Sequence, residues 1–471
     1  MSVIDRSGRR AARAAGSPCK VPRRLVWLAL MALSSGAQAM SFAEAYEAAR
    51  GHDARYRAAN HELTAARQGV PVARAALLPT VNLNVSESSV LGTRRIANGS
   101  NQDVRLRVDY DAPQTSVTLR MPLFNREASS VYQQAQAQSE VAESVYRGQG
   151  LDLVDRLAVA YLQALLAEEG KRLVDAQEQA LIVQLQQAER RLERGEGTRV
   201  NVAQGRAALD LTRARQIDAQ DQVELARRAL RRVTGLPTPP LRQVPPDYTP
   251  TSLIPEGMVA WLDLALRQSP TLRAREQALT VARMAVQRQT AGHYPRLDLI
   301  ASMARSENES LSSLGQSATL RTVGVQLNVP LYNGGGVEAS IKQALASQAR
   351  AEEEIRAERE NVELEVQRHY QATANGAKKI AAHRQAVASA ALALEGSRRA
   401  LEAGVGTMTE LADAQAQLYV VQRDLAQARI DYLISRMRLM VQAGVPMADA
   451  AADLDQSLVA VAGTADAPKQ P

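Results

Sequence analysis

The sequence predicts an α+β protein made of two successive copies of one unit, which combines two alternating strands with very long helices. Residues 121–125 (Met-Pro-Leu-Phe-Asn) recur as residues 329–333 (Val-Pro-Leu-Tyr-Asn), an offset of 208. Residues 192–198 (Leu-Glu-Arg-Gly-Glu-Gly-Thr) recur as residues 401–407 (Leu-Glu-Ala-Gly-Val-Gly-Thr), an offset of 209. Because the offset is nearly constant, we infer an internal repeat whose copies each read helix, strand, strand, helix, helix.

The strands are predicted from segments in which apolar and polar residues alternate over about ten residues, the length of a tilted transmembrane strand. Asn84 and Gln326 belong to the row that we expect to face water. The apolar row that we expect to face lipid contains Leu83, Leu119, Leu299 and Val325. A half-buried strand of a soluble sheet has the same period. Since about eight strands are needed to close a barrel, a membrane role for these four requires several copies to share one barrel.

A long helical pattern follows the second strand of each copy, at residues 127–194 and 337–403. The second stretch contains no proline, and its apolar residues include a series at strict seven-residue spacing, namely Ile380, Val387, Leu394 and Leu401. Heptad spacing indicates coiled-coil packing against a neighbouring helix.

Each long helix is interrupted by Gly-x-Gly-Thr, and a second helix follows at residues 198–233 and 407–443. Glycine favours the C-terminal cap of a helix and threonine the N-terminal cap, so this motif predicts the tip of a helical hairpin. The tip residues are Gly195, Gly197, Thr198, Gly404, Gly406 and Thr407.

The N-terminus is predicted to be a secretory signal. Seven basic residues flank or precede a nine-residue apolar run at 25–33, and Ala-Gln-Ala at 37–39 provides a cleavage site after Ala39. Loss of this segment removes seven basic residues and one acidic residue, so the formal charge falls from +7 to +1. We therefore expect no nucleic-acid partner. The one cysteine, Cys19, leaves with the segment, and neither a disulfide nor a lipid anchor is expected.

Five segments are expected along the chain. They are a signal peptide (1–39), a first structural repeat (40–236), a proline-rich linker or belt (237–255), a second structural repeat (256–446) and a partly disordered C-terminal tail (447–471). Pro79 and Pro122 of the first copy correspond to Pro295 and Pro330 of the second, and the first interval is eight residues longer. This excess predicts a longer surface loop between Val90 and Thr115, outside the cell.

Catalytic signatures are missing from the sequence, which contains no H-E-x-x-H, no G-x-S-x-G and no P-loop. We expect no enzyme, cofactor or metal site, and a secreted hydrolase would need a nucleophile or metal cluster that the sequence does not offer. The most informative polar residues are Glu410 and Asp413, three apart on one helix face just after a tip. Acids there either favour the positive end of the helix dipole or, with several copies around an axis, form a cation-selective carboxylate ring.

These features together resemble the TolC family of outer-membrane ducts. The motifs that carry the resemblance are residues 41–46, the two Pro-Leu-(Phe/Tyr)-Asn landmarks, Gly334-Gly335-Gly336, Asp413-Ala414-Gln415, Leu418-Tyr419 and residues 428–433. The resemblance implies a homotrimer in which each subunit adds four strands to one 12-stranded outer-membrane β-barrel. It also implies a periplasmic α-helical coiled-coil tunnel that meets a periplasmic adaptor and an inner-membrane transporter.

The resemblance also assigns site residues. Glu410 and Asp413 fall on the family's paired gate acids, and the hairpin tips become the expected docking surface for the adaptor. The segment before Glu410 is shorter than in the secretion branch, which makes Arg199 and Asn201 candidate gate partners.

The function implied by the resemblance is a channel-tunnel of a tripartite export system. The N-terminal pattern is most similar to type I secretion ducts, in which an ABC exporter delivers an unfolded protein, with a repeat-in-toxin polypeptide as candidate cargo. The alternatives are a small-molecule efflux duct, served by an ABC transporter or a proton-driven pump, and a periplasmic coiled-coil adaptor or scaffold.

Overall fold

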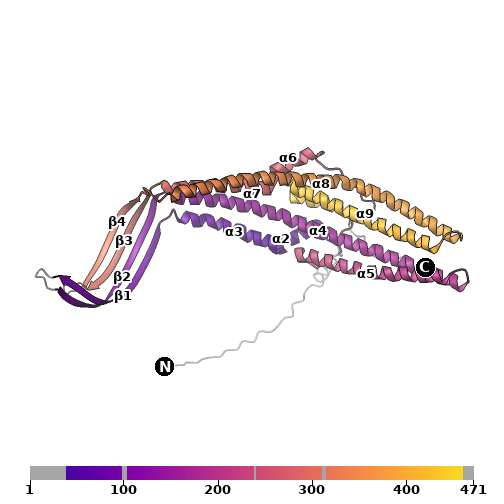
Figure 1. Cartoon of the computed structure of the whole chain (residues 1–471), viewed down its shortest axis with the longest axis horizontal. Helices are drawn as coiled ribbons and strands as arrows, with labels where there is room; N and C mark the ends of the chain where they lie inside the picture. The colour runs from indigo at the N-terminus through magenta and orange to yellow at the C-terminus, as the bar shows by residue number, and fades with distance from the viewer. Residues whose placement is uncertain (1–38, 98–102, 238–239, 310–314, 460–471) are drawn as a thin grey trace, which may run out of the picture.

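The computed structural model describes residues 39–97, 103–237, 240–309 and 315–459. A sheet lies at one end of an elongated molecule, and paired helices extend from it (Figure 1). The elements are α2 (Phe42–His52), α3 (Ala54–Ala75), β1 (Thr80–Ala97), β2 (Asp103–Asn125), α4 (Arg126–Glu193), α5 (Arg199–Thr234), α6 (Met258–Gln268), α7 (Pro270–Thr290), η1 (Ala291–His293), β3 (Arg296–Glu309), β4 (Gly315–Asn328), α8 (Gly336–Glu402), α9 (Met408–Gln442) and α10 (Met447–Gln456). The expected signal, apart from Ala39, and the last twelve residues lie outside the described part.

The sheet has four antiparallel strands in the order β1-β2-β3-β4, so β1 and β4 form its two edges. The strands contain 18, 23, 14 and 14 residues, longer than the ten or so expected from the sequence. A register shift between Pro122 and Phe124 marks a bulge where β2 leaves the sheet. Proline cannot donate to a ladder, which explains why the irregularity lies there.

The eight-residue excess of the first copy lengthens the strands, and the expectation of a longer loop was wrong. In β1 and β2 the pairing runs from Thr80 with Arg120 to Ala97 with Asp103, which is 18 pairs. The pairing of β3 with β4 has 14 pairs. Four additional pairs account for all eight residues. The extra residues do lie between Val90 and Thr115, as expected, but most of that interval is paired strand.

The two faces of the sheet differ in polarity and in the solvent exposure of their side chains. Directly paired residues share a face, and register places the expected lipid-facing row on the odd-numbered face of all four strands. Along β3 the odd-numbered Met303 and Arg305 are exposed, whereas the even-numbered Ser302 and Ala304 are half-buried. This difference indicates that the sheet curves with its even-numbered face inside. We call the odd-numbered face convex and the even-numbered face concave.

The long helices α4 and α8 run from the sheet to the far end of the molecule (Figure 1). Each pairs with α3 or α7 near the sheet and with α5 or α9 toward the far end. In the expected heptad series Ile380 is buried, and the other three members are half-buried. Toward the far end of α4, the buried residues Val174, Leu181 and Ala188 also have seven-residue spacing.

The first helix of each expected unit is split in two. Asp53 accepts a hydrogen bond from the Tyr56 amide (2.8 Å) and begins α3, and Ser269 accepts one from the Leu272 amide (3.3 Å) and begins α7. Although burial alone would raise the pKa of Asp53, hydrogen bonds from Arg156 and from the Tyr56 amide lower it. Its stabilising contribution is therefore present at neutral pH and lost as the pH falls through the folded-state pKa.

The main apolar core lies midway along the helices. The rings of Phe42 and Tyr161 meet edge to face at 5.8 Å, and the Tyr161 hydroxyl donates to the Met40 carbonyl (2.7 Å). The proline-rich segment is bound to this core and is not a free linker. Its Leu241 and Tyr248 are buried, and several of its carbonyls accept hydrogen bonds from α8 and α9.

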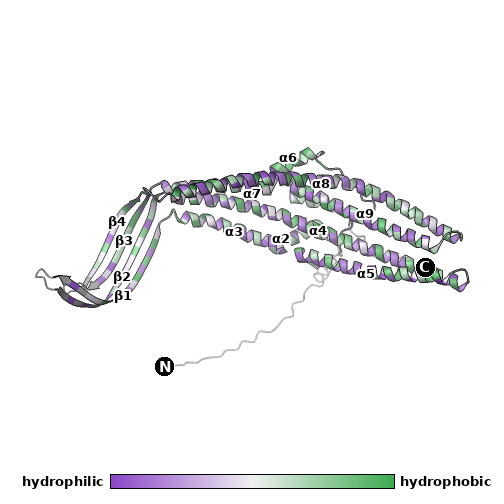
Figure 2. Ribbon diagram, viewed as in Figure 1, coloured by the Kyte–Doolittle hydropathy of each residue, from purple (hydrophilic) through white to green (hydrophobic). Residues whose placement is uncertain are grey.

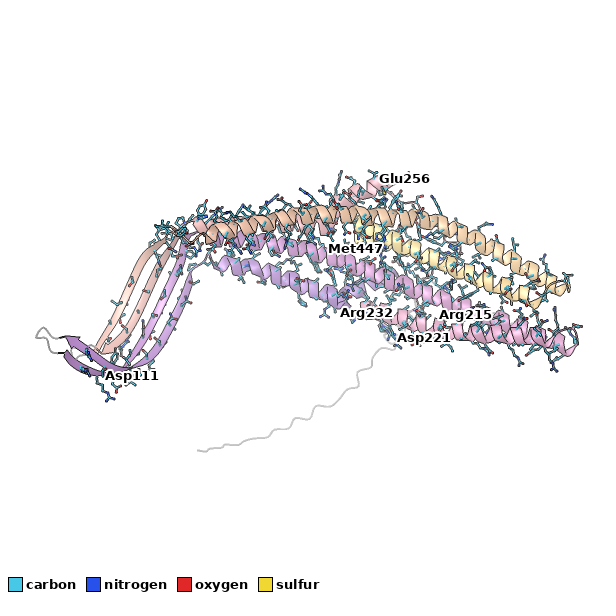
Figure 3. The ribbon with its side chains drawn as sticks, viewed as in Figure 1. Asp111, Arg215, Asp221, Arg232, Glu256 and Met447 are labelled. Carbon is cyan, nitrogen blue, oxygen red and sulfur yellow. The ribbon has the colours of Figure 1, made fainter. Side chains whose placement is uncertain are left out.

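The helix α10 (Met447–Gln456) occupies the start of the expected C-terminal tail, residues 447–471. Arg436 donates to both carboxylate oxygens of Asp453 (2.8 and 2.7 Å) and to the Thr251 carbonyl (3.1 Å). Asp455 accepts hydrogen bonds from the amides of Phe42 (2.8 Å) and Ala43. The helix α10 thereby holds the start of α2. Met447, the first residue of α10, lies beside the helical body in Figure 3.

Candidate functional site

The two hairpin tips have the same local geometry, as the Gly-x-Gly-Thr motif predicts. Gly195 and Gly404 both have φ = +76°, and the amide after each donates to a carbonyl five residues back. A Cβ atom on Gly406 would lie 2.9 Å from the Leu401 nitrogen, and one on Gly197 would lie 3.0 Å from the Leu192 nitrogen. Only glycine fits these close approaches without displacing the backbone. The motif therefore builds both tips.

The tips differ in how the following helix begins. Thr407 and Glu410 form a reciprocal capping box, with the Glu410 amide donating to the Thr407 hydroxyl (3.2 Å) and the Thr407 amide donating to the Glu410 carboxylate (3.0 Å). At the first tip Thr198 accepts from the Asn201 amide (3.2 Å), and its capping site has no acid. Glu410 thus has the helix-start role that the sequence left open.

Asp413 lies one turn further along α9 and is exposed. Within the described part of the chain, its carboxylate has no hydrogen bond or ion pair to a side chain. Arg199 and Asn201 form no side-chain bond to Glu410 or Asp413 among the described residues. The two hairpins are instead linked near their tips by a hydrogen bond from the Thr409 hydroxyl to the Gln204 side-chain oxygen (3.4 Å). Sequence reasoning missed this pair, because neither residue belongs to a motif.

The part of the convex face nearer the helices is an extended apolar surface. Val81, Leu83 and Val325 are 63%, 65% and 61% exposed. Hydrophobic and hydrophilic segments alternate along the strands in Figure 2. The same part of the concave face carries mainly asparagine, serine, threonine and glutamine, including Asn84 and Gln326. A soluble sheet covers its apolar face, whereas here the sheet projects away from the helices (Figure 1).

No group of three or more histidine, cysteine, aspartate or glutamate side chains in the described part of the chain is placed to hold a metal ion. None of the described helices combines the length and apolar character of a membrane-crossing helix.

Comparisons with known proteins agree with this geometry. The family model described as "Outer membrane efflux protein" matches residues 45–236 and 261–445. The alkaline protease secretion protein AprF of Pseudomonas aeruginosa is 33% identical over 432 residues, covering 90% of this chain and 89% of the relative. The proteases secretion protein PrtF of Dickeya chrysanthemi is 32% identical, with coverages of 88% and 90%. The outer membrane protein TolC of Vibrio cholerae is 28% identical, with coverages of 87% and 92%.

A solved structure supports the fold. The outer-membrane channel OprN superposes with a TM-score of 0.72 at 20% sequence identity, covering 86% of this chain and 90% of that chain. The matches confirm the resemblance to TolC-type ducts and the expected outer-membrane location with a large helical part. The chain belongs to the outer membrane efflux protein family.

Proposed function

We propose that this chain is one subunit of a trimeric duct that carries an unfolded protein from an inner-membrane ABC exporter across the outer membrane. The observation that carries the proposal is the sheet, with its apolar convex face, polar concave face and two open edges. An apolar exterior and a polar interior are what a water-filled barrel in lipid requires. The relatives AprF and PrtF are named for protease secretion, which supports a polypeptide cargo.

The trimer follows from the open edges and from the resemblance. In one chain β1 and β4 each have an unpaired side, and unpaired strand edges cannot face hydrocarbon. Three copies joined edge to edge supply twelve strands, more than the practical minimum for a closed barrel. The helices would then enclose a tunnel that continues the barrel into the periplasm.

An internal repeat underlies this assembly. The bounds of α6 lie 216 residues after those of α2, and α9 begins 209 residues after α5. Gly235 ends α5 against His52, the last residue of α2, and Gly444 follows α9 against Gln268, the last residue of α6. Matched contacts at matched offsets support two structural copies within each subunit.

The partners and cargo are part of the proposal. The two hairpin tips, which lie farthest from the sheet, are the surface that we assign to the periplasmic adaptor. A secreted protease is the cargo that the names of AprF and PrtF favour, and a repeat-in-toxin polypeptide is the cargo that the family resemblance implies. A small-molecule efflux duct is the second candidate, favoured by the family description. We assign the chain no catalytic role.

Fractionation of cells that express the full chain tests the duct. We expect the protein in the outer-membrane fraction, extractable only with detergent, and migrating as a heat-sensitive trimer in gels and by native mass measurement. Recovery as a monomer in the soluble periplasm would contradict the duct and favour the scaffold.

We further propose that Glu410 and Asp413 of three subunits form a carboxylate ring at the periplasmic mouth. The support is their shared helix face, the exposure of Asp413 and the resemblance to gate acids. Divalent cations should bind this ring and block the current, and the block should weaken at acidic pH as the carboxylates protonate.

Planar-bilayer recordings of a charge-neutral variant test the ring. Glu410→Gln with Asp413→Asn removes both charges while glutamine preserves the capping box, so the tip should remain folded. We expect cation block to be lost and the trimer retained. Glu196→Gln, at the first tip, is the matched control and should keep the block. Unchanged block in the double variant would leave both acids with a purely local role.

A further inference from the structure

Charged side chains are scarce on the concave face of the sheet. Among the described side chains of the four strands, that face carries Arg120, Asp298 and Arg296, and its other members are uncharged. Each of the three has an opposite charge beside it. Arg120 pairs with Asp298, and Arg296 pairs with Glu127 in the first turn of α4. The part of the concave wall nearer the helices is therefore neutral as well as polar.

The Arg120–Asp298 pair joins β2 to β3 beside the bulge at Pro122. In the register Arg120 lies opposite Ile300 and Asp298 lies opposite Pro122, so the two are diagonal neighbours on one face. The Arg120 Nε atom donates to Asp298 Oδ2 at 3.1 Å, and Nη2 donates to the same oxygen. The Asp298 side chain is only 8% exposed, whereas that of Arg120 is 60% exposed. The aspartate is buried against the wall, and the guanidinium borders the open space.

We propose that Asp298 neutralises Arg120 so that the β-lined part of the pore nearest the helices shows no fixed charge to the polypeptide that passes through it. This inference rests on the trimeric duct proposed above. In a trimer three Arg120 side chains surround the axis, and a ring of unpaired charges selects ions of one sign. An unfolded protein presents segments of both signs, and an unpaired arginine ring would retain the acidic ones. Pairing with Asp298 removes this discrimination at the junction of barrel and helices.

A purely structural role is the competing explanation, because the ion pair also ties β2 to β3 beside an irregular register. The two explanations predict different effects of removing each partner. If the pair only holds strands together, loss of either partner harms assembly in the same way. If it balances charge in the pore, loss of the acid and loss of the base change ion selectivity in opposite directions.

Reversal potentials of the purified full-length protein in planar bilayers, under a KCl gradient, test the proposal. Asp298→Asn should shift the permeability ratio toward chloride, since three arginines lose their counter-charge. Arg120→Gln should shift it toward potassium. The double variant should return close to the unmodified protein, which keeps the test valid if Arg120→Gln alone assembles poorly because it leaves a buried carboxylate unpaired.

The matched control is Asp111→Asn, the same chemical change on the convex face at the end of the sheet far from the helices (Figure 3). It should leave the reversal potential unchanged. Shifts in the same direction for both single variants, or shifts no larger than that of Asp111→Asn, would overturn the charge-balancing role while leaving the duct intact. If the unmodified protein forms no channel, both the duct and this role are overturned.

Discussion

Replacing Leu119 by arginine should prevent assembly of the protein in the outer membrane. Leu119 lies on the convex face, in the central row of the apolar band, directly opposite Val81 on β1 and Ala301 on β3. An arginine at the bilayer midplane costs about 2–4 kcal/mol, and three subunits would each carry one. The yield of heat-sensitive trimer extracted from the outer membrane measures the effect.

Asn84→Arg provides the control for that variant. Asn84 lies on the concave face, which meets water in the proposed barrel, so an arginine there should be tolerated. Equal losses of trimer for the two variants, or equal tolerance, would mean that the convex face does not contact lipid.

Replacing Arg436 by methionine should cause the second large effect, through loss of the α10 anchor. Its side chain is only 10% exposed, and the carboxylate of Asp453 raises its pKa by hydrogen bonding. Removing one member of a buried pair typically costs about 3–5 kcal/mol, and the partial exposure of Asp453 favours about 3 kcal/mol here. The change also removes a donor to the Thr251 carbonyl. Thermal unfolding of the purified protein in detergent measures the loss.

Arg228→Met is the matched control for Arg436→Met. Arg228 pairs with Glu224 on the surface of α5, with both side chains more than half exposed, and such pairs contribute about 0–1 kcal/mol. We also expect protease to cleave between α9 and α10 faster in Arg436→Met than in Arg228→Met. Similar stabilities for the two variants would show that α10 is held by its apolar contacts alone.

Sequence reasoning predicted the helical part most accurately where the signals are local. The bounds of α4 and α8 differ from the expected ones by a single residue at each end, because long proline-free stretches are closed by glycine and threonine caps. The tips follow from the same motif. The predicted heptad series was less precise, since only Ile380 of its four members is buried and the depth of each residue depends on the partner helix.

Elements that depend on distant contacts were missed. The helix α10 is held by Arg436 and by its contact with the start of α2, about four hundred residues away in sequence. The outer parts of β1 and β2 break the apolar alternation with charged residues such as Glu87 and Asp109, yet their backbones still pair. Polarity patterns therefore underestimated strand length, because hydrogen bonding between strands does not require an apolar face.

The candidate sites also divide into residues that local sequence patterns identify and residues that only the folded structure brings together. Glu410 and Asp413 were found because three-residue spacing places them on one helix face. The ion pair of Arg120 with Asp298 joins residues 178 positions apart, and only the register of β2 with β3 brings them together. Arg199 and Asn201 were chosen for their nearness to the first tip, and in the structure neither side chain reaches the acids of the second.

The central claim is that the sheet crosses the outer membrane and the helical tips lie in the periplasm. Cysteine labelling of intact cells with a membrane-impermeant maleimide tests it most directly, in variants Asp111→Cys, at the far end of the sheet, and Val405→Cys, at a tip where Val405 is 83% exposed. The background is low because the one native cysteine, Cys19, lies in the predicted signal. We expect Asp111→Cys to label on intact cells, and Val405→Cys to label only after the outer membrane is permeabilised. Labelling of both variants only after permeabilisation, or labelling of the tip alone on intact cells, would contradict the account.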